Sequence, residues 1–148
     1  MNDYSNEHIR EVCHGVKDYK EDAIQEMVDY FVSLNILDSS SVIIPAPQHQ
    51  GYAIYTKSIA DRLGMITGAK VLDVLRCVPH ETLYSQKLQG KFEPPQMFLT
   101  ENVEVDGDYF FLDNVIATGT TFAEANKLFG NKLKPLIYAI DKTKNPNI

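Results

Sequence analysis

The sequence predicts an α/β fold in which a mostly parallel central sheet carries helices on both faces. Segments with helical spacing of apolar residues alternate with short, wholly apolar runs, as in 19–37 followed by 42–44. Apolar runs of this kind are typical of parallel strands, which are buried on both faces and joined by helical crossovers. At 148 residues the chain has the size of one domain, so we expect a single domain spanning residues 1–148.

The first half of the chain is expected to contain a helix, a strand and a second helix. Apolar residues from Tyr19 to Leu37 recur at spacings of mostly three and four, which predicts an amphipathic helix. Residues 42–44 are predicted to form a buried strand that ends where Pro45 removes a backbone donor. Helical spacing returns from Tyr52 to Leu63, and Gly64 is well placed to end that helix.

The second half is predicted to be more irregular. Residues 69–78 are expected to form the next strand. Residues 79–108, which include three prolines, form a connection that is long for a compact domain, and such connections are usually functional or disordered. Strands at 109–113 and 135–141, separated by a helix at 121–129, complete the pattern.

Composition and charge exclude several classes of protein. Apolar residues at 44% and charged residues at 23% are close to globular averages, so a disordered or fibrous chain is excluded. The net charge of −6 argues against a protein that holds nucleic acid by neutralising phosphates. Cys13 and Cys77 fit neither a zinc site nor a disulfide framework. Without an apolar leader or membrane-length run, a cytoplasmic protein with no membrane contact is expected.

The stretch "YFFLDNVIATGTT", residues 109–121, contains the residues that point to a chemistry. Asp113 and Asn114 fall at the carboxyl end of a strand, where ligands of parallel sheets bind. The turn that follows opens a helix, whose free N–H groups and dipole favour an anion, while Asp113 suits sugar hydroxyls. The predicted ligand is therefore a ribose 5-phosphate, and the predicted phosphate loop consists of Ala117, Thr118, Gly119, Thr120 and Thr121.

The segment "FFLDNVIATGTT" resembles the phosphoribosyl-diphosphate (PRPP) signature of type I phosphoribosyltransferases. The resemblance implies a pentosyltransferase that moves the 5-phosphoribosyl group of PRPP to a nitrogen acceptor, a nucleobase or related amine, and releases diphosphate. It implies Asp113 and Asn114 as the catalytic pair. It also implies Mg²⁺ that PRPP carries with it, with Asp113 as the residue that could contact the ion directly.

Asn114 departs from the family pattern, which has two adjacent acids. An amide can hydrogen-bond ribose hydroxyls, but it has no charge with which to stabilise a positive sugar ring. A PRPP- or nucleotide-binding regulatory module without turnover is therefore an alternative to the transferase. A sugar-phosphate hydrolase is a third reading, although the sequence shows no general base for a water.

Two further segments resemble parts of the same family. The layout of "VIIPAPQHQGYAIYTKSIADRLG", similar to ComF-like members, implies a diphosphate loop, and an ordinary turn is the alternative. The segment "LRCVPHETLYSQKLQGKF" occupies the place of a flexible loop that closes over substrate, and solvated loop residues are the alternative there. These segments contribute Pro47, Gln48, His49, Gln50 and Gly51 to the diphosphate loop and Arg76, Tyr84, Ser85, Gln86 and Lys87 to the flexible loop.

The length of the chain adds an expectation about the acceptor. A chain of 148 residues implies only a minimal hood over the acceptor site. The expected small-molecule partners are PRPP and an acceptor that the sequence does not identify. Many relatives are dimers, so a homodimer is also implied by the resemblance.

Overall fold

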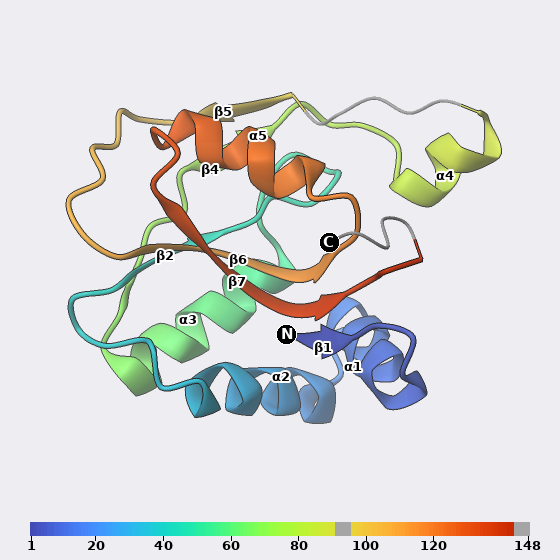
Figure 1. Ribbon diagram of the computed structural model, residues 1–148, viewed down its shortest axis with the longest axis horizontal. Helices are drawn as coiled ribbons and strands as arrows, with labels where there is room; N and C mark the ends of the chain where they lie inside the picture. Colours follow the sequence, from blue (N-terminus) through green and yellow to red (C-terminus); the bar gives the residue numbers. More distant parts are fainter. Residues whose placement is uncertain (91–95, 144–148) are drawn as a thin grey trace.

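A computed structural model describes residues 1–90 and 96–143, except for the side chains of residues 83, 84 and 87. Within these residues, five strands form one sheet in the order β1-β7-β6-β2-β3, and every neighbouring pair in it is parallel (Figure 1). The strands of this sheet are β1 (Asn2–Asp3), β2 (Val42–Pro45), β3 (Lys70–Val71), β6 (Tyr109–Ile116) and β7 (Leu133–Ile140). The predicted α/β fold class is thus confirmed.

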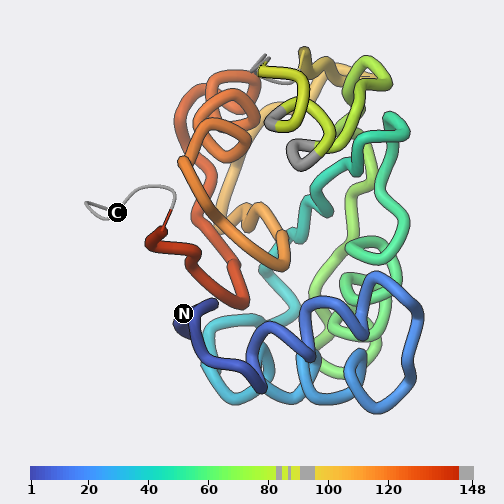
Figure 2. The backbone as a smooth tube through the Cα atoms, turned by 90° about the vertical axis from the view of Figure 1, so that its right-hand side faces the viewer, coloured from blue at the N-terminus to red at the C-terminus, as the bar shows by residue number. Residues whose placement is uncertain are grey.

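Helices cover both faces of this sheet. One face carries α1, α2 and α3, while α5 lies on the other beside a small antiparallel pair, β4 and β5 (Figures 1 and 2). The helices among the described residues are α1 (Glu7–Lys17), α2 (Glu21–Ser33), α3 (Tyr55–Thr67), α4 (Leu83–Leu88) and α5 (Thr120–Leu128).

The central strand β6 divides its side chains between two cores. Phe110 and Leu112 pack with the cluster under α1, α2 and α3, whereas Tyr109 and Phe111 pack with the cluster under α5. All four are buried, and each such burial stabilises the fold by about 1.5–3 kcal/mol. Because β6 is held between β2 and β7, its carboxyl end is fixed in position at the middle of the sheet edge.

The prediction of one strand at 69–78 was wrong. The segment divides into β3, in the main sheet, and β4 (Leu75–Cys77), which pairs with β5 (Met97–Leu99). The strand that β3 accompanies, β2, ends at Pro45 after four residues. A four-residue β2 has too few backbone groups to pair with a longer strand, and the chain turns away from it near Asp73.

Gly64 does not end the second helix as expected. The helix α3 continues to Thr67, and Gly68, with a φ of 82°, is its C-cap. A Cβ at Gly64 would lie 2.9 Å from the carbonyl oxygen of Ala69. Gly64 therefore serves the close approach of α3 to the next strand, and Gly68 supplies the left-handed turn.

The sequence analysis missed the elements at the beginning of the chain. The Asn6 side chain accepts a hydrogen bond from the N–H of Ile9 and caps α1, while β1 adds to the edge of the sheet beside β7. Residues 79–108 were predicted to form a long irregular connection, and the structure forms α4 and β5 within it. None of the helices in the described ranges has the length and apolar character needed to cross a membrane.

Candidate functional site

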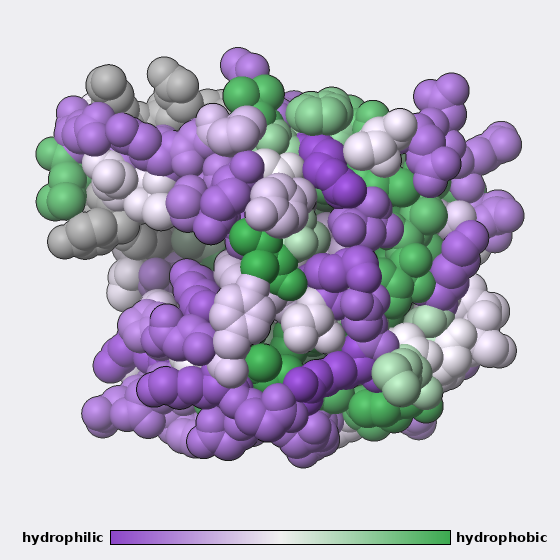
Figure 3. Space-filling model, turned by 180° about the vertical axis from the view of Figure 1, so that it is seen from behind, coloured by the Kyte–Doolittle hydropathy of each residue, from purple (hydrophilic) through white to green (hydrophobic). Residues whose placement is uncertain are grey.

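A cavity of about 760 Å³ opens at the carboxyl ends of β2 and β6. In Figure 3 the molecule is hollowed at its left edge, between an upper and a lower part. The predicted site residues that line the cavity are Pro47, Gln48, His49, Gln50, Asp113, Asn114, Ala117, Thr118, Gly119 and Thr121. Gly51 and Thr120 belong to the same loops but are not part of the lining. Two segments far apart in the sequence therefore face one space.

The predicted phosphate loop forms the entrance to α5. Gly119 is the N-cap with a φ of 83°, a left-handed conformation that glycine adopts without strain. No side chain caps the helix in the described part of the chain, and no acceptor there meets the N–H groups of Thr121 and Phe122. Free N–H groups at the positive end of a helix dipole provide a binding position for an anion.

Asp113 lies beside this loop and is half-buried. One of its carboxylate oxygens accepts the N–H of Asn114 at 2.8 Å. Burial raises the pKa of Asp113 to about 6, and the Asn114 hydrogen bond and the charge of Lys17 oppose that rise. At neutral pH the carboxylate is therefore mostly ionised and can accept hydrogen bonds from hydroxyl groups.

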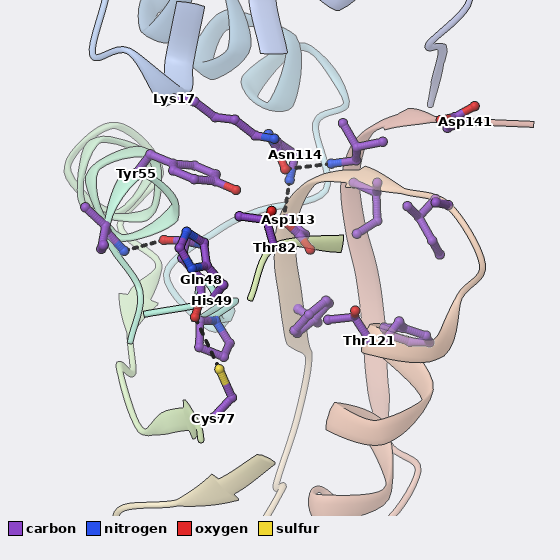
Figure 4. Close-up of a pocket in the computed structure, with 18 of the residues that line it drawn as sticks. Lys17, Gln48, His49, Tyr55, Cys77, Thr82, Asp113, Asn114, Thr121 and Asp141 are labelled. Carbon is purple, nitrogen blue, oxygen red and sulfur yellow. Dashed lines mark hydrogen bonds between the residues drawn. The ribbon is translucent and has the colours of Figure 1, made fainter. Parts of the chain in front are cut away.

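Asn114 is 5% exposed and has one unpaired group. Its side-chain oxygen accepts the N–H of Val115 at 2.9 Å, as the dashed line in Figure 4 shows. Its Nδ2 has no hydrogen-bond partner within the described residues. A buried donor without a partner costs about 1–3 kcal/mol, so a ligand that offers an acceptor here gains that energy back.

The predicted diphosphate loop is held by its own hydrogen bonds. The Gln48 side chain, 8% exposed, donates to the carbonyl of Ala46 at 2.9 Å and accepts the N–H of Ile54. The Sγ of Cys77 lies 3.2 Å from the carbonyl oxygen of Gln48. Gln48 therefore fixes the shape of the loop (Figure 4). The N–H groups of His49 and Gln50 meet no acceptor in the described part and remain available.

His49 of this loop lies beside a second histidine, His80. The His49 Nδ1 is 3.2 Å from the carbonyl oxygen of His80, and the ring centroids are 6.4 Å apart. Both residues line the cavity, as does Thr82 from the same segment as His80. The sequence analysis did not assign His80 to the site, because nothing local in the sequence indicates that 79–82 folds back onto His49.

Of the predicted flexible-loop residues, Arg76, Ser85 and Gln86 are not part of the cavity lining. The Arg76 guanidinium lies 3.0 Å from a carboxylate oxygen of Asp73. Gln86 donates to the carbonyl of Glu81 at 2.9 Å. The side chains of Tyr84 and Lys87 lie outside the described residues. A lid role for this segment stays a prediction.

The far end of the cavity is formed by residues that the sequence analysis did not identify. They lie directly after β1, at the end of α1 and in the turn that follows it, in α3 and directly after β7: Tyr4, Lys17, Tyr19, Tyr55 and Asp141. Tyr19, 53% exposed, has a φ of 58° in the turn between α1 and α2. A bulky residue rarely adopts that conformation. A predicted helix at 7–17 would have indicated Lys17 alone, because the other four residues lie outside α1.

The donor set does not fit a metal held by the protein at the ribose position. In the described part of the chain, no three His, Cys, Asp or Glu side chains gather as metal ligands. Asp113 is a single carboxylate, and beside it Asn114 presents an unpaired N–H group. Hard cations such as Mg²⁺ prefer oxygen ligands. The described residues beside Asp113 therefore do not by themselves form a site for the expected Mg²⁺.

Comparisons with known proteins give the fold class. A scan against protein-family models gives no match, and neither does a search of curated proteins. Solved structures do match, among them a hypoxanthine phosphoribosyltransferase from Staphylococcus aureus with a TM-score of 0.52 and 15% sequence identity. The match covers 82% of this chain and 65% of that enzyme. The protein therefore has a phosphoribosyltransferase-like fold, and the chain spans less than two thirds of that enzyme's length.

Proposed function

We propose that the protein is a phosphoribosyltransferase that moves the 5-phosphoribosyl group of PRPP to a nitrogen acceptor. The observation that carries this proposal is that the helix entrance at Gly119 and the Asp113 carboxylate face one cavity. A phosphate monoester and the hydroxyls of its own pentose need such an arrangement. The similarity of the fold to a hypoxanthine phosphoribosyltransferase supports it.

Each loop has a role in the proposed reaction. The N–H groups of Thr121 and Phe122 bind the 5-phosphate, and Asp113 accepts hydrogen bonds from the ribose hydroxyls. The diphosphate lies against the N–H groups of His49 and Gln50. A nitrogen nucleophile forms a bond to C1 while the bond from C1 to the diphosphate oxygen breaks. The diphosphate leaves with the electron pair, and the proton of the nitrogen is released to solvent. The protein positions the reactants and stabilises charge, without a covalent nucleophile.

A second candidate function has one observation in its favour. Asn114, where the resemblance leads us to expect a second acid, adds no negative charge near the sugar ring. Positive charge that develops on the ring in the transition state is then stabilised by Asp113 alone. A regulatory module that binds PRPP or a nucleotide without turning it over fits this arrangement.

Titration of the protein with PRPP, followed by an assay for diphosphate with a panel of nucleobases, separates these functions. Base-dependent release of diphosphate supports the transferase, and binding without release supports the regulatory module. Release without any base indicates a hydrolase instead. Asp113→Asn should weaken PRPP binding, whereas Glu101→Gln, at an exposed position outside the cavity lining, should not. Unchanged affinity in Asp113→Asn contradicts the proposed site.

A further inference from the structure

The corner of the cavity next to Asp113 is rich in hydrogen-bond donors. Asn114 Nδ2 is buried and has no partner among the described residues. The side-chain oxygen of the same amide accepts the N–H of Val115, which fixes the amide so that Nδ2 is the group left over. An unpaired buried donor in a cavity wall indicates a ligand atom with a lone pair.

Lys17, at the end of α1, adds a positive charge to this corner. Its side chain runs toward Asn114 in Figure 4, and its charge acts on Asp113. In the described part of the chain the side chain of Lys17 has neither a hydrogen bond nor an ion pair. Lys17 and Asn114 therefore present N–H groups where a metal-binding site would present oxygens.

A sugar diol has both hydroxyl protons and oxygen lone pairs to satisfy. Ionised Asp113 accepts the protons, and the lone pairs then need either a cation or hydrogen-bond donors. A divalent cation beside an ammonium and an outward N–H group is repelled. The same two groups are well suited to the hydroxyl oxygens themselves.

We infer that Lys17 and Asn114 replace a divalent cation at the ribose hydroxyls, so that this site binds a pentose 5-phosphate without a metal ion. This inference rests on the proposed function, because it takes the pentose phosphate as the ligand. It assigns Lys17, which lies outside both predicted loops, as a residue that recognises the sugar. Mg²⁺ bound to a diphosphate is then part of the substrate and not a requirement of the ribose position.

Calorimetric titration of the full chain with ribose 5-phosphate, in EDTA and again in MgCl₂, tests the inference. The affinity should agree within about twofold between the two buffers, because donors and not a cation bind the hydroxyls. Binding that requires MgCl₂ overturns the inference and leaves the proposed function intact. Absence of binding in both buffers overturns the proposed function together with the inference.

Two variants sharpen the test. Lys17→Gln should lose about tenfold in affinity in both buffers, since one charge-assisted hydrogen bond is removed. Asn114→Asp should lose about tenfold in EDTA, where two adjacent carboxylates repel each other and the donor is gone, and should recover in MgCl₂. Equal affinity of Asn114→Asp and the natural protein in EDTA counts against the inference.

A matched control separates sugar recognition from general attraction to phosphate. Lys20→Gln changes an exposed lysine of the same turn that is not part of the cavity lining, and should leave affinity unchanged. With 2-deoxyribose 5-phosphate, which lacks one hydroxyl, the loss caused by Lys17→Gln should shrink. An equal loss for both sugars assigns Lys17 to the phosphate and overturns its proposed role. If circular dichroism shows that Asn114→Asp does not fold, Lys17→Gln, at an exposed position, still tests the inference.

Discussion

The two loops that face the cavity both present free N–H groups, at Thr121 and Phe122 and at His49 and Gln50 in the described part of the chain, but they differ in the side-chain hydrogen bonds that hold them. In the loop at 117–121, the first turn of α5 has no side-chain cap, and its N–H groups at Thr121 and Phe122 are free in the described part of the chain. In the loop at 47–51, the Gln48 side chain forms hydrogen bonds through both its nitrogen and its oxygen. The N–H of Gly51 donates to the carbonyl of Gln48 within the same loop.

This difference indicates separate tasks. A loop at a helix entrance without a side-chain cap gains hydrogen bonds there when a ligand arrives, so its residues decide affinity. A loop whose side chains are already bonded is preorganised, so its residues decide geometry and stability before any ligand is present. Variants in the two loops should therefore separate ligand affinity from folding stability.

The strongest way to break the open loop is Gly119→Val. Valine at a φ of 83° is strained, and the N–H groups that follow lose their alignment. We expect a loss of about a hundredfold in affinity for ribose 5-phosphate, which corresponds to one or two charge-assisted hydrogen bonds. Isothermal titration calorimetry measures this loss.

Gly130→Val is the matched control, because Gly130 has a φ of 65° with open space around it, beyond the end of α5. Both variants should lose about 1–2 kcal/mol of unfolding free energy from backbone strain, but Gly130→Val should keep full affinity. Equal affinities for the two variants refute the assignment of the phosphate position.

The bonded loop is tested by Gln48→Ala. Removal of the side chain leaves the N–H of Ile54 without its acceptor, so unfolding in urea should show a loss of about 2 kcal/mol. PRPP affinity should fall by about tenfold as the loop loosens, whereas ribose 5-phosphate, which lacks the diphosphate, should bind as before. Gln50→Ala, at an exposed position of the same loop, should leave stability unchanged; a similar loss there contradicts the role of Gln48.

The smallest expected effect on affinity is a pH dependence from Asp113. Burial raises its pKa from 3.8 to about 6, so the folded protein holds a proton that the unfolded chain releases. Stability therefore falls as pH rises through the interval between these values, and Asp113→Asn should remove that fall. Affinity should move in the opposite direction, because the hydroxyls need the ionised carboxylate, with a gain of about fivefold as pH rises through that pKa.

Titration of ribose 5-phosphate over this range measures the pH effect. The ligand's own phosphate ionises near pH 6 and adds a parallel rise, and Asp113→Asn shares that contribution but lacks the carboxylate. The difference between the two profiles of affinity against pH gives the contribution of the Asp113 carboxylate. Parallel profiles mean that Asp113 does not contact the sugar.

The sequence alone determined the fold class and the position of the helix entrance at Gly119. Both depend on order along the chain: apolar runs predict buried parallel strands, and Gly119 among threonines after β6 predicts an open helix entrance. The predicted helix at 121–129 agrees with α5 within one residue at each end. Asp113 could be placed for the same reason, because it lies near the carboxyl end of β6.

Only the tertiary structure decided which distant residues complete the cavity and how the polar groups are shared. Lys17 and Tyr55 reach the same cavity because α1 and α3 pack on one face of the sheet, and His80 meets His49 across 31 positions. The break at 69–78 likewise depends on the short partner β2. Pairing and packing between separate segments set these features, and they cannot be predicted from the residues that are adjacent in the sequence.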